Sequence, residues 1–401
     1  MKTPFFSIVI PTKNRAALVR VAIESLLQQT FPDIEIILTD NDDTDATEQV
    51  FREFDDPRLR WLRTGNHSMP DNWERGCAEA KGEYICVLED KQSVKRRAFE
   101  RLHSLFEKHR PQSAKWRCDA ILDNQVPTRV RILPPAEKEP DMVASDEILD
   151  AFCRDPSVTY KQTLPLPQFS AFHKDLAARV RNGPMGRLFH AVSPDVILGF
   201  LQLNETDAIL DVPEAHYLYS SLRASNGASF TVRGPLFRQF QSELGGGDSL
   251  FHEHTPVKSI SVPCSVYNDF LRTRDRAGGR LADHELCWAK FFVDTQVAIW
   301  EVAFQDVDVS ADQSSWDEAF KKLPTETQKD IEARLEKLRN KRGPESFAVR
   351  RRSERLGLKR FWKQCQAFMR GRVLGDPRWR LNDPREFLAW EAKQPAPWDQ
   401  G

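Results

Sequence analysis

The chain has 401 residues, of which 40% are hydrophobic and 29% are charged, and its formal net charge at pH 7 is −1. This composition is ordinary for a soluble globular protein with room for two or three domains, and the near-neutral charge excludes a strong electrostatic bias of the whole molecule. The seven cysteines are scattered and form no Cys-x-x-Cys pair or zinc spacing, so we expect reduced thiols in a cytosolic compartment.

The apolar runs of the chain are short. The residues before Pro11 comprise one lysine and about seven mostly apolar residues, too few for a signal peptide. No apolar run approaches the roughly 18 residues that span a bilayer. We therefore expect a cytoplasmic protein that is not integral to a membrane.

Strand and helix patterns alternate over the first 110 residues. Buried strand runs occur at 5–11, 34–39, 59–62 and 84–88, and helical spacing occurs at 16–29, 44–54, 71–80 and 94–109. Repeated strand–helix units of this length predict an α/β fold with a mostly parallel sheet flanked by helices.

The remaining sequence divides into two stretches. Residues 110–230 are rich in proline, with helices expected near 145–153 and 175–181 and strands near 168–173 and 208–212. Helices are expected at 259–271, 283–304 and 317–339. We predict a domain at 1–235, with a nucleotide-binding half at 1–110 and an acceptor half at 111–235, followed by a helical extension at 236–401.

The segment 337–380 is strongly basic, with fifteen Lys and Arg residues against three acids. Apolar side chains, including Phe361, Trp362 and Phe368, share one face of a possible helix among these cations. Three interpretations stay open: a solvated helical face, a peripheral anchor on an anionic membrane surface, and nucleic-acid binding. The last is disfavoured because no recognition motif accompanies the charge.

Polar residues gather where the expected strands of the first half end. They are Pro11, Thr12, Asn14 and Arg15 after the first strand, Asp40 and Asn41 after the second, Asn72 and Arg75 in a helix, and Glu89 and Asp90 after the fourth strand. Ligands of open α/β sheets bind at the carboxyl ends of the strands. Adjacent buried carboxylates need a cationic partner, and carboxylate and phosphate oxygens suit a divalent ion.

These motifs, S-I-V-I-P-T-K-N-R, T-D-N-D-D-T-D-A-T and N-W-E-R-G-x-x-x-A-K-G-E-Y-I-x-x-L-E-D, resemble the family-two glycosyltransferases of GT-A fold. The resemblance is clear over about residues 5–110 and weaker to about 235. It implies a Rossmann-like domain in which a nucleotide-diphosphate sugar lies across the strand ends, with Thr12 and Asp40 at the nucleotide. It further implies that Glu89 and Asp90 hold Mg²⁺ or Mn²⁺ on the diphosphate.

One residue departs from the family pattern. The family usually reads L-D-D-D or L-D-x-D where this chain reads L-E-D-K, so Lys91 stands where a further acid is common. Lys91 either contacts a phosphate and partly replaces the metal charge, or points away and leaves Asp90 as the metal ligand, or marks a weakened activity.

Asp195, in the run H-A-V-S-P-D, is the candidate general base. In inverting members of the family, an acid from the acceptor half removes the proton of the attacking hydroxyl. The structural alternative is that Asp195 only caps a helix at 196–203.

We therefore predict a glycosyltransferase that moves a sugar from a nucleotide-diphosphate donor to an acceptor hydroxyl with inversion. The acceptor is expected to be a cell-surface polysaccharide or a glycolipid, so the partners would be a nucleotide sugar and a saccharide or lipid-linked acceptor. The alternatives are a degenerate GT-A protein that binds sugars or serves as a scaffold, and a sugar-phosphate nucleotidyltransferase. The second is disfavoured because P-T-K-N-R lacks the glycine-rich loop of that class.

Overall fold

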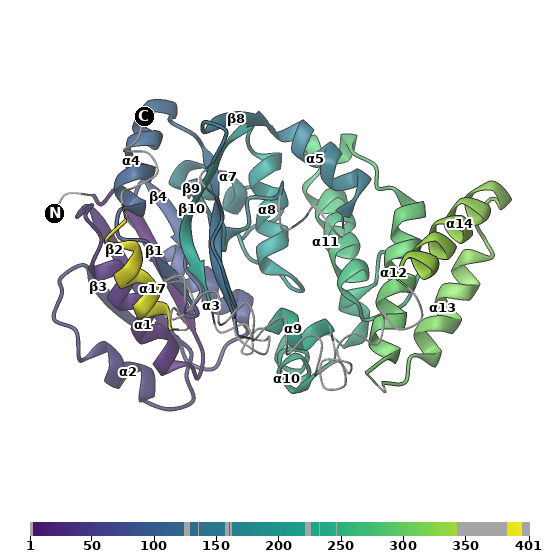
Figure 1. Cartoon of the computed structure of the whole chain (residues 1–401), viewed down its shortest axis with the longest axis horizontal. Coiled ribbons are helices and arrows are strands. Elements are labelled where there is room, and N and C mark those ends of the chain that lie inside the picture. The colour runs from purple at the N-terminus through teal and green to yellow at the C-terminus, as the bar shows by residue number, and fades with distance from the viewer. Residues whose placement is uncertain are drawn as a thin grey trace, which may run out of the picture.

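The computed structural model describes residues 3–123, 129–134, 136–156, 160, 163–220, 226–231, 233–245, 247–305, 307–342 and 383–394. Within them, ten strands form one sheet in the order β3-β2-β1-β4-β9-β6-β10-β5, with β7 beside β6 and β8 beside β10 (Figure 1). The strands are β1 (Phe6–Thr12), β2 (Ile34–Asp40), β3 (Leu59–Arg63), β4 (Tyr84–Val87), β5 (Gln92–Val94), β6 (Ser113–Leu122), β7 (Arg129–Arg131), β8 (Asp141–Ala144), β9 (Ser170–His173) and β10 (Ala208–Tyr219).

The first four strands in this order are parallel. Strand β1 pairs with β2 and β4, so Phe6 lies beside both Ile34 and Tyr84. Every residue of β1 and β2 is buried, as expected of parallel strands covered on both faces. Strand β9 is antiparallel to β4 and β6, whereas β6 and β10 run parallel to each other. The predicted α/β class with a mostly parallel sheet is confirmed.

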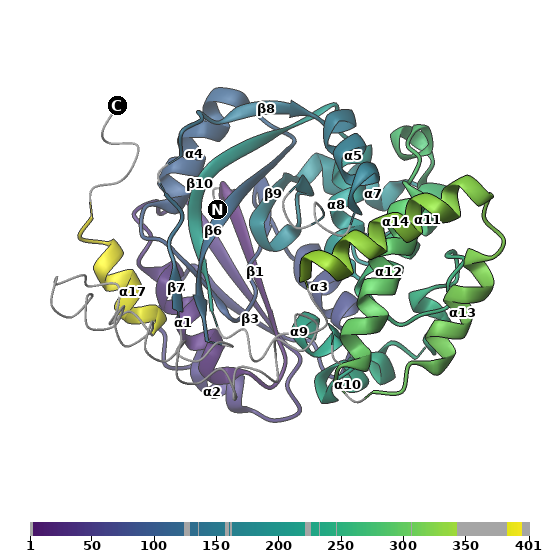
Figure 2. The same cartoon turned by 45° about the vertical axis from the view of Figure 1, so that its right-hand side comes forward.

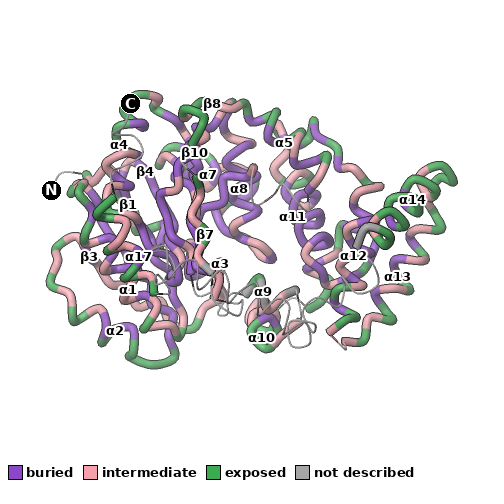
Figure 3. Tube along the Cα trace, viewed as in Figure 1, coloured by how far each residue is buried: buried purple, intermediate pink, exposed green. Residues whose placement is uncertain are grey.

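Helices cover both faces of this sheet. One face packs against α1 (Ala16–Leu27), α2 (Ala46–Phe51) and α4 (Ala98–His109). The other packs against α3 (Met69–Ala78), α7 (Lys174–Asn182) and α8 (Pro194–Asn204), and Figure 3 shows the buried strands between the two layers. A Cβ atom on Gly76 of α3 would lie 2.4 Å from the Val9 side chain. The glycine of N-W-E-R-G therefore lets α3 approach the sheet closely.

A helical layer extends the molecule beyond the sheet (Figures 1 and 2). It comprises α5 (Ser145–Arg154), α9 (Asn226–Thr231), α10 (Pro235–Leu244), η3 (Asp248–Phe251), α11 (Val262–Ala277), α12 (Trp288–Ala303), α13 (Ser310–Phe320) and α14 (Thr325–Arg342). One hydrophobic cluster joins Phe152 of α5 and Phe200 of α8 to Phe270, Phe292 and Ile331 of the later helices. The helical extension thus shares a core with the α/β domain, and the boundary at 235 stays a prediction.

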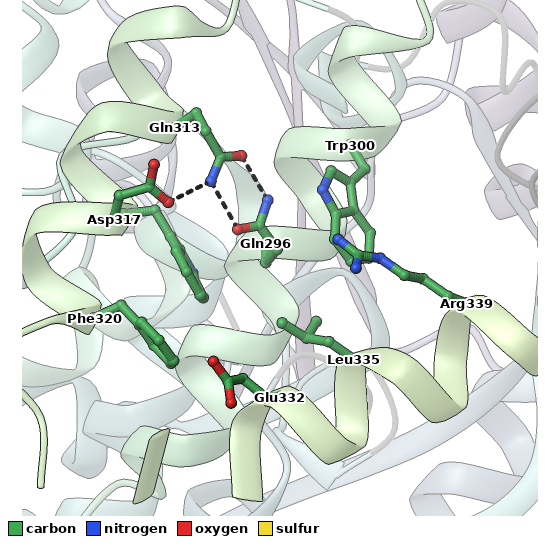
Figure 4. Close-up of a pocket in the computed structure, with 9 residues that line it drawn as sticks. Gln296, Trp300, Gln313, Asp317, Phe320, Glu332, Leu335 and Arg339 are labelled. Atoms are coloured by element: carbon green, nitrogen blue, oxygen red, sulfur yellow. Dashed lines mark hydrogen bonds between the residues drawn. The ribbon is translucent and has the colours of Figure 1, made fainter. Parts of the chain in front are cut away.

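Polar contacts tie the last three helices of this layer together (Figure 4). The side chains of Gln296 and Gln313 exchange two hydrogen bonds, of 2.7 and 3.0 Å, between α12 and α13. The guanidinium of Arg339 on α14 lies 4.4 Å from the ring centre of Trp300. These residues line a cavity of about 370 Å³, and within it the two side-chain amides form hydrogen bonds with each other.

Near its C-terminus the chain returns to the sheet domain. Helix α17 (Pro384–Glu391) lies beside α1, where Arg385 forms hydrogen bonds of 2.6 and 2.7 Å with the carboxylate of Glu24. Phe387 is fully buried against Ile121 and Leu218. The basic segment 337–380 lies outside the described residues from 343 onward, so its three interpretations stay predictions.

Several predicted boundaries differ from the structure. The helix expected at 317–339 is two helices, α13 and α14, because the chain turns before Pro324. The helix expected at 94–109 starts only at Ala98 and follows strand β5. Helix α3 begins at Met69, before the expected start at 71, and is capped by Ser68, whose hydroxyl accepts the Asp71 amide. Strand β6 lies within the proline-rich stretch and helix α10 directly after it, and the sequence analysis predicts neither element.

Candidate active site

A cavity of about 800 Å³ opens at the carboxyl ends of β1 and β4. Ten of the twelve predicted site residues line it: Pro11, Thr12, Asn14, Arg15, Asn41, Asn72, Glu89, Asp90, Lys91 and Asp195. We call the first nine of these, with Lys13, the donor rim. The parallel arrangement of β1, β2 and β4 places their ends together, as chain order predicted.

Asp90 is the buried centre of the donor rim. Its carboxylate accepts a 3.0 Å hydrogen bond from the Thr12 hydroxyl and lies 3.4 Å from the Arg15 guanidinium. Burial raises the pKa of Asp90, and the neighbouring cations Arg15 and Lys91 oppose that shift. Asp90 is thus held by the loop after β1 while remaining at the cavity wall.

Lys91 is an almost fully buried cation in the same loop. Its ammonium nitrogen lies 3.3 Å from a carboxylate oxygen of Glu89 and 5.2 Å from the centre of the Tyr219 ring. Burial lowers the pKa of Lys91, but Glu89 and Tyr219 outweigh that effect and the net shift is upward. Lys91 is therefore charged at neutral pH and lines the cavity.

The geometry around Glu89 and Asp90 does not favour the metal site predicted there. Both carboxylates already face a cation, Lys91 for the first and Arg15 for the second. The described residues contain no group of three His, Cys, Asp or Glu side chains that could hold a metal ion. A divalent ion would have to compete with two fixed positive charges, so these residues fit such an ion poorly.

Two amide side chains of the donor rim hold the backbone in place. Asn41 donates to the His67 carbonyl and accepts its amide, both at 2.8 Å. Asn72 accepts the Thr64 hydroxyl at 2.8 Å and donates to the Thr39 carbonyl at 3.4 Å. Their visible role is to join the loop after β2 to the start of α3, beside the cavity.

Asn14 adopts the left-handed conformation, with φ of 56°. Its backbone amide donates to the Asp42 carboxylate, and its side chain donates to Asp43 at 2.7 Å. Asn is one of the few non-glycine residues that tolerate this conformation. The turn directs the neighbouring Arg15 toward Asp90.

The structure does not bring two predicted residues to the cavity wall. Asp40 is fully buried beneath it, where its carboxylate accepts the Trp61 indole N–H at 3.1 Å and faces Arg63 at 3.3 Å. Arg75 is exposed on α3 and does not line the cavity. Their assignment to the nucleotide stays a prediction that this geometry does not support.

Asp195 lines the same cavity as the donor rim. It is the second residue of α8 (Pro194–Asn204), and the N-cap position of that helix is occupied by Ser193 rather than by Asp195. Its carboxylate accepts a 2.9 Å hydrogen bond from the Gln168 side chain. Burial raises the pKa of Asp195 above that of an ordinary aspartate, although the Gln168 bond lowers it in part.

Two glutamines that sequence analysis missed connect this acid to the donor rim. The Gln92 side chain accepts the Glu89 amide at 2.8 Å and donates to the Gln168 carbonyl at 3.1 Å. Gln168 in turn binds Asp195. A sequence offers no signal for such a chain, because its two members are 76 residues apart and glutamine has no motif of its own.

Asp269 of α11 was also missed. This fully buried carboxylate accepts the backbone amides of Val192 at 3.3 Å and Ser193 at 3.0 Å, directly before α8. Burial raises its pKa to about 6, although Arg272 at 3.2 Å opposes the shift. Asp269 therefore fixes the backbone that presents Asp195.

The cavity side away from the strands is apolar. We call this lining the apolar wall; it consists of Val196, Phe230, Leu236, Phe237, Phe240, Phe251, Val262 and Val266. The ring centres of Phe230 and Phe237 are 4.6 Å apart, and those of Phe237 and Phe251 are 5.5 Å apart. Aromatic and aliphatic lining with few polar groups is typical of small-molecule sites.

Comparison with known proteins agrees with the motifs of the donor rim. Residues 7–174 match the family model described as glycosyl transferase family 2. The matched residues, less than half of the chain, are similar to that family. The matched range contains the entire donor rim, and Asp195 and the whole apolar wall lie outside it.

Curated relatives match a short part of the chain. The chain is 34% identical over 91 residues to the GalNAc(5)-diNAcBac-PP-undecaprenol beta-1,3-glucosyltransferase of Campylobacter jejuni, covering 22% of this chain and 29% of that protein. It is 33% identical over 100 residues to the glycosyltransferase GlyG of Streptococcus pneumoniae, covering 24% and 33%. The matched segments thus span a third or less of these relatives.

Among solved structures, S. aureus TarS 1–349 in complex with UDP-GlcNAc is similar to this chain. The sequence identity is 11%, the TM-score is 0.46, and the similarity covers 79% of this chain and 90% of that one. Among the described helices, none combines the length and apolar character that crossing a bilayer requires.

Proposed function

We propose that this protein transfers a sugar from a nucleoside-diphosphate donor to an acceptor hydroxyl with inversion at the anomeric carbon. The observation that carries the proposal is one cavity lined both by the donor rim of a family 2 glycosyltransferase domain and by Asp195. A carboxylate with a raised pKa that faces a cavity is suited to general base catalysis.

The proposed reaction is a single displacement. The acceptor oxygen forms a bond to the anomeric carbon while the bond from that carbon to the donor phosphate oxygen breaks. The proton of the acceptor hydroxyl passes to Asp195, and the electron pair of the broken bond stays on the nucleoside diphosphate. Gln168 and Asp269 hold the base and its backbone, so they are positioning residues.

The apolar wall supports a lipid-linked or otherwise amphipathic acceptor. A free saccharide would leave the phenylalanine side of the cavity without a partner, whereas an acceptor with an apolar chain would cover it. The printed name of the Campylobacter relative likewise describes an undecaprenol-linked acceptor. An anionic membrane surface that binds the segment 337–380 would suit such an acceptor, and this part of the proposal rests on sequence alone.

The test is a panel of UDP-, GDP- and TDP-sugars incubated with the full chain and a polyprenyl-linked saccharide, with and without Mn²⁺. We expect release of nucleoside diphosphate from at least one donor, and a product whose anomeric configuration, read by NMR, is opposite to that of the donor. A protein that binds a donor without breaking it down would instead support the degenerate, sugar-binding alternative. If no donor bound or reacted under any condition, the transferase proposal would be wrong.

A further inference from the structure

Both the backbone and the side chain of Lys91 are held by neighbouring residues. Its carbonyl oxygen accepts both the backbone amide and the hydroxyl of Ser220, at 3.1 and 3.0 Å. Its side chain is only 6% exposed and lies against the Tyr219 ring. The residue is thus clamped between the loop after β4 and the end of β10, with its ammonium group at the cavity.

The charges around it form a balanced set. Glu89 and Asp90 contribute two negative charges, and Lys91 and Arg15, at 3.3 and 3.4 Å from them, contribute two positive charges. A divalent ion between the same two carboxylates would supply the same two positive charges. The protein therefore already contains, as side chains, the positive charge that such an ion would bring.

A second, incoming cation would meet repulsion at this place. Any ion within coordination distance of the Glu89 carboxylate would lie close to the Lys91 ammonium, in a part of the protein that excludes most water. Arg15 stands in the same relation to Asp90. A diphosphate, in contrast, is an anion and meets two buried or half-buried cations.

We propose that Lys91, together with Arg15, takes the place of a divalent metal in neutralising the donor diphosphate, so that this enzyme works without a metal ion. The inference rests on the proposed function. When the bond between sugar and phosphate breaks, its electron pair stays on the phosphate oxygen, and the added negative charge is stabilised by the Lys91 ammonium. Lys91 keeps its proton throughout, and the acceptor proton goes to Asp195.

The test measures binding of UDP, GDP and TDP to the full chain by calorimetry, once in EDTA and once in MnCl₂. We expect at least one of them to bind with dissociation constants that agree within about threefold in the two solutions. In EDTA, Lys91→Met should weaken this binding by about 30-fold or more, because it removes a buried charge from the phosphate site. Lys91→Arg should retain most of the affinity, since it retains the charge.

Lys91→Asp sharpens the test, because a third acid at this place would turn the site into one that needs a metal. Its binding should be weak in EDTA and recover in MnCl₂. The matched control is Lys115→Met, which removes another lysine with a side chain only 6% exposed, paired with Asp211 at 3.2 Å and away from the cavity. It should leave nucleotide affinity unchanged, and thermal unfolding of every variant reports whether it folds.

The outcomes separate this inference from the function on which it rests. Wild-type binding that weakens tenfold or more in EDTA would overturn the inference and leave the transferase proposal standing. A folded Lys91→Met protein that binds nucleotide as well as wild type in EDTA would also overturn it. If no nucleoside diphosphate bound in either solution, both proposals would fall together.

Discussion

The two sides of the cavity differ in the side chains that they present: the donor rim is charged and polar, and the apolar wall is aliphatic and aromatic. On the donor rim, each charged side chain after β1 and β4 faces an opposite charge, and loop backbone is fixed by Asn41 and Asn72. The apolar wall presents aliphatic and aromatic side chains from α8 to α11, several of which pack against one another, such as Phe230, Phe237 and Phe251. Under the proposed function, this difference predicts that donor binding depends on fixed charges, whereas acceptor binding depends on apolar area.

The largest effect is expected where the two sides meet, at Asp195. Asp195→Asn removes the general base, so we expect transfer to slow on the order of 10³-fold while nucleotide affinity stays within about twofold. Because burial raises the pKa of Asp195, wild-type transfer should also fall with decreasing pH sooner than for an ordinary aspartate base. Steady-state kinetics over a pH series measures the rate of transfer, and calorimetry measures the nucleotide affinity. Unchanged transfer in the folded variant would show that Asp195 lines the cavity but is not the general base.

Asp269 lies behind the wall and is expected to affect stability in a pH-dependent way. Its pKa is raised from 3.8 to about 6 in the folded protein, so its stabilising effect is complete below about pH 4 and is lost as the pH rises through about 6. The change amounts to about 3 kcal/mol in the free energy of unfolding.

The comparison with Asp269→Asn isolates this group, because the variant has no carboxyl to titrate. The stability of wild type relative to the variant should fall by that amount between pH 4 and pH 7, as measured by urea unfolding. An equal difference at both pH values would mean that Asp269 titrates as an exposed carboxyl does.

Leu236 tests the wall alone. Its side chain lines the cavity and is 36% exposed, so Leu236→Ser should remove apolar area available to an acceptor. We expect the KM for a polyprenyl-linked acceptor to rise about tenfold, equivalent to roughly 1.4 kcal/mol, with an unchanged KM for the donor. Trp288→Ser is the matched control, since Trp288 is 39% exposed on α12 and does not line the cavity. A rise in the donor KM would contradict the division between the two sides.

The smallest effect is expected at the direct link between the two sides, where Lys13 of the rim lies 2.9 Å from Glu243 of α10. Both side chains are partly exposed, so Glu243→Gln should cost about 0.5 kcal/mol of unfolding free energy. Nucleotide affinity should change less than twofold at moderate salt. Glu79→Gln, which breaks the pair with Arg60 away from the cavity, serves as control. A large loss of affinity in Glu243→Gln alone would show that α10 is part of the donor site.

Sequence analysis predicted the donor rim better than the wall for a physical reason. Thr12, Asn41 and Asp90 follow buried strands, and parallel pairing brings the ends of such strands together without further information. The wall is assembled from segments far apart in the chain, among them α8, α10 and α11, whose packing no local period reveals. Asp195 was predicted through resemblance and stays a prediction, and the contact of Asp269, 74 residues later, is visible only once α11 has been placed beside α8.

The same distinction explains why Asn41 lines the cavity and its neighbour Asp40 does not. Asp40 is the last residue of β2 and Asn41 follows it, and residue type alone does not say which of the two side chains reaches the cavity. Trp61 and Arg63 on β3 draw the Asp40 carboxylate beneath the cavity, and Asn41 remains at its wall.

The glutamine pair between the two sides has a consequence for how the site responds to acidity. Amide groups neither gain nor lose protons over the physiological range, so the spacing that Gln92 and Gln168 maintain between the Glu89 loop and Asp195 does not depend on the protonation of either end. A drop in pH can protonate Asp195 while the hydrogen bonds of these two amide side chains stay in place. Inactivation by mild acid should therefore be immediate and fully reversible, because it protonates the base without breaking these hydrogen bonds.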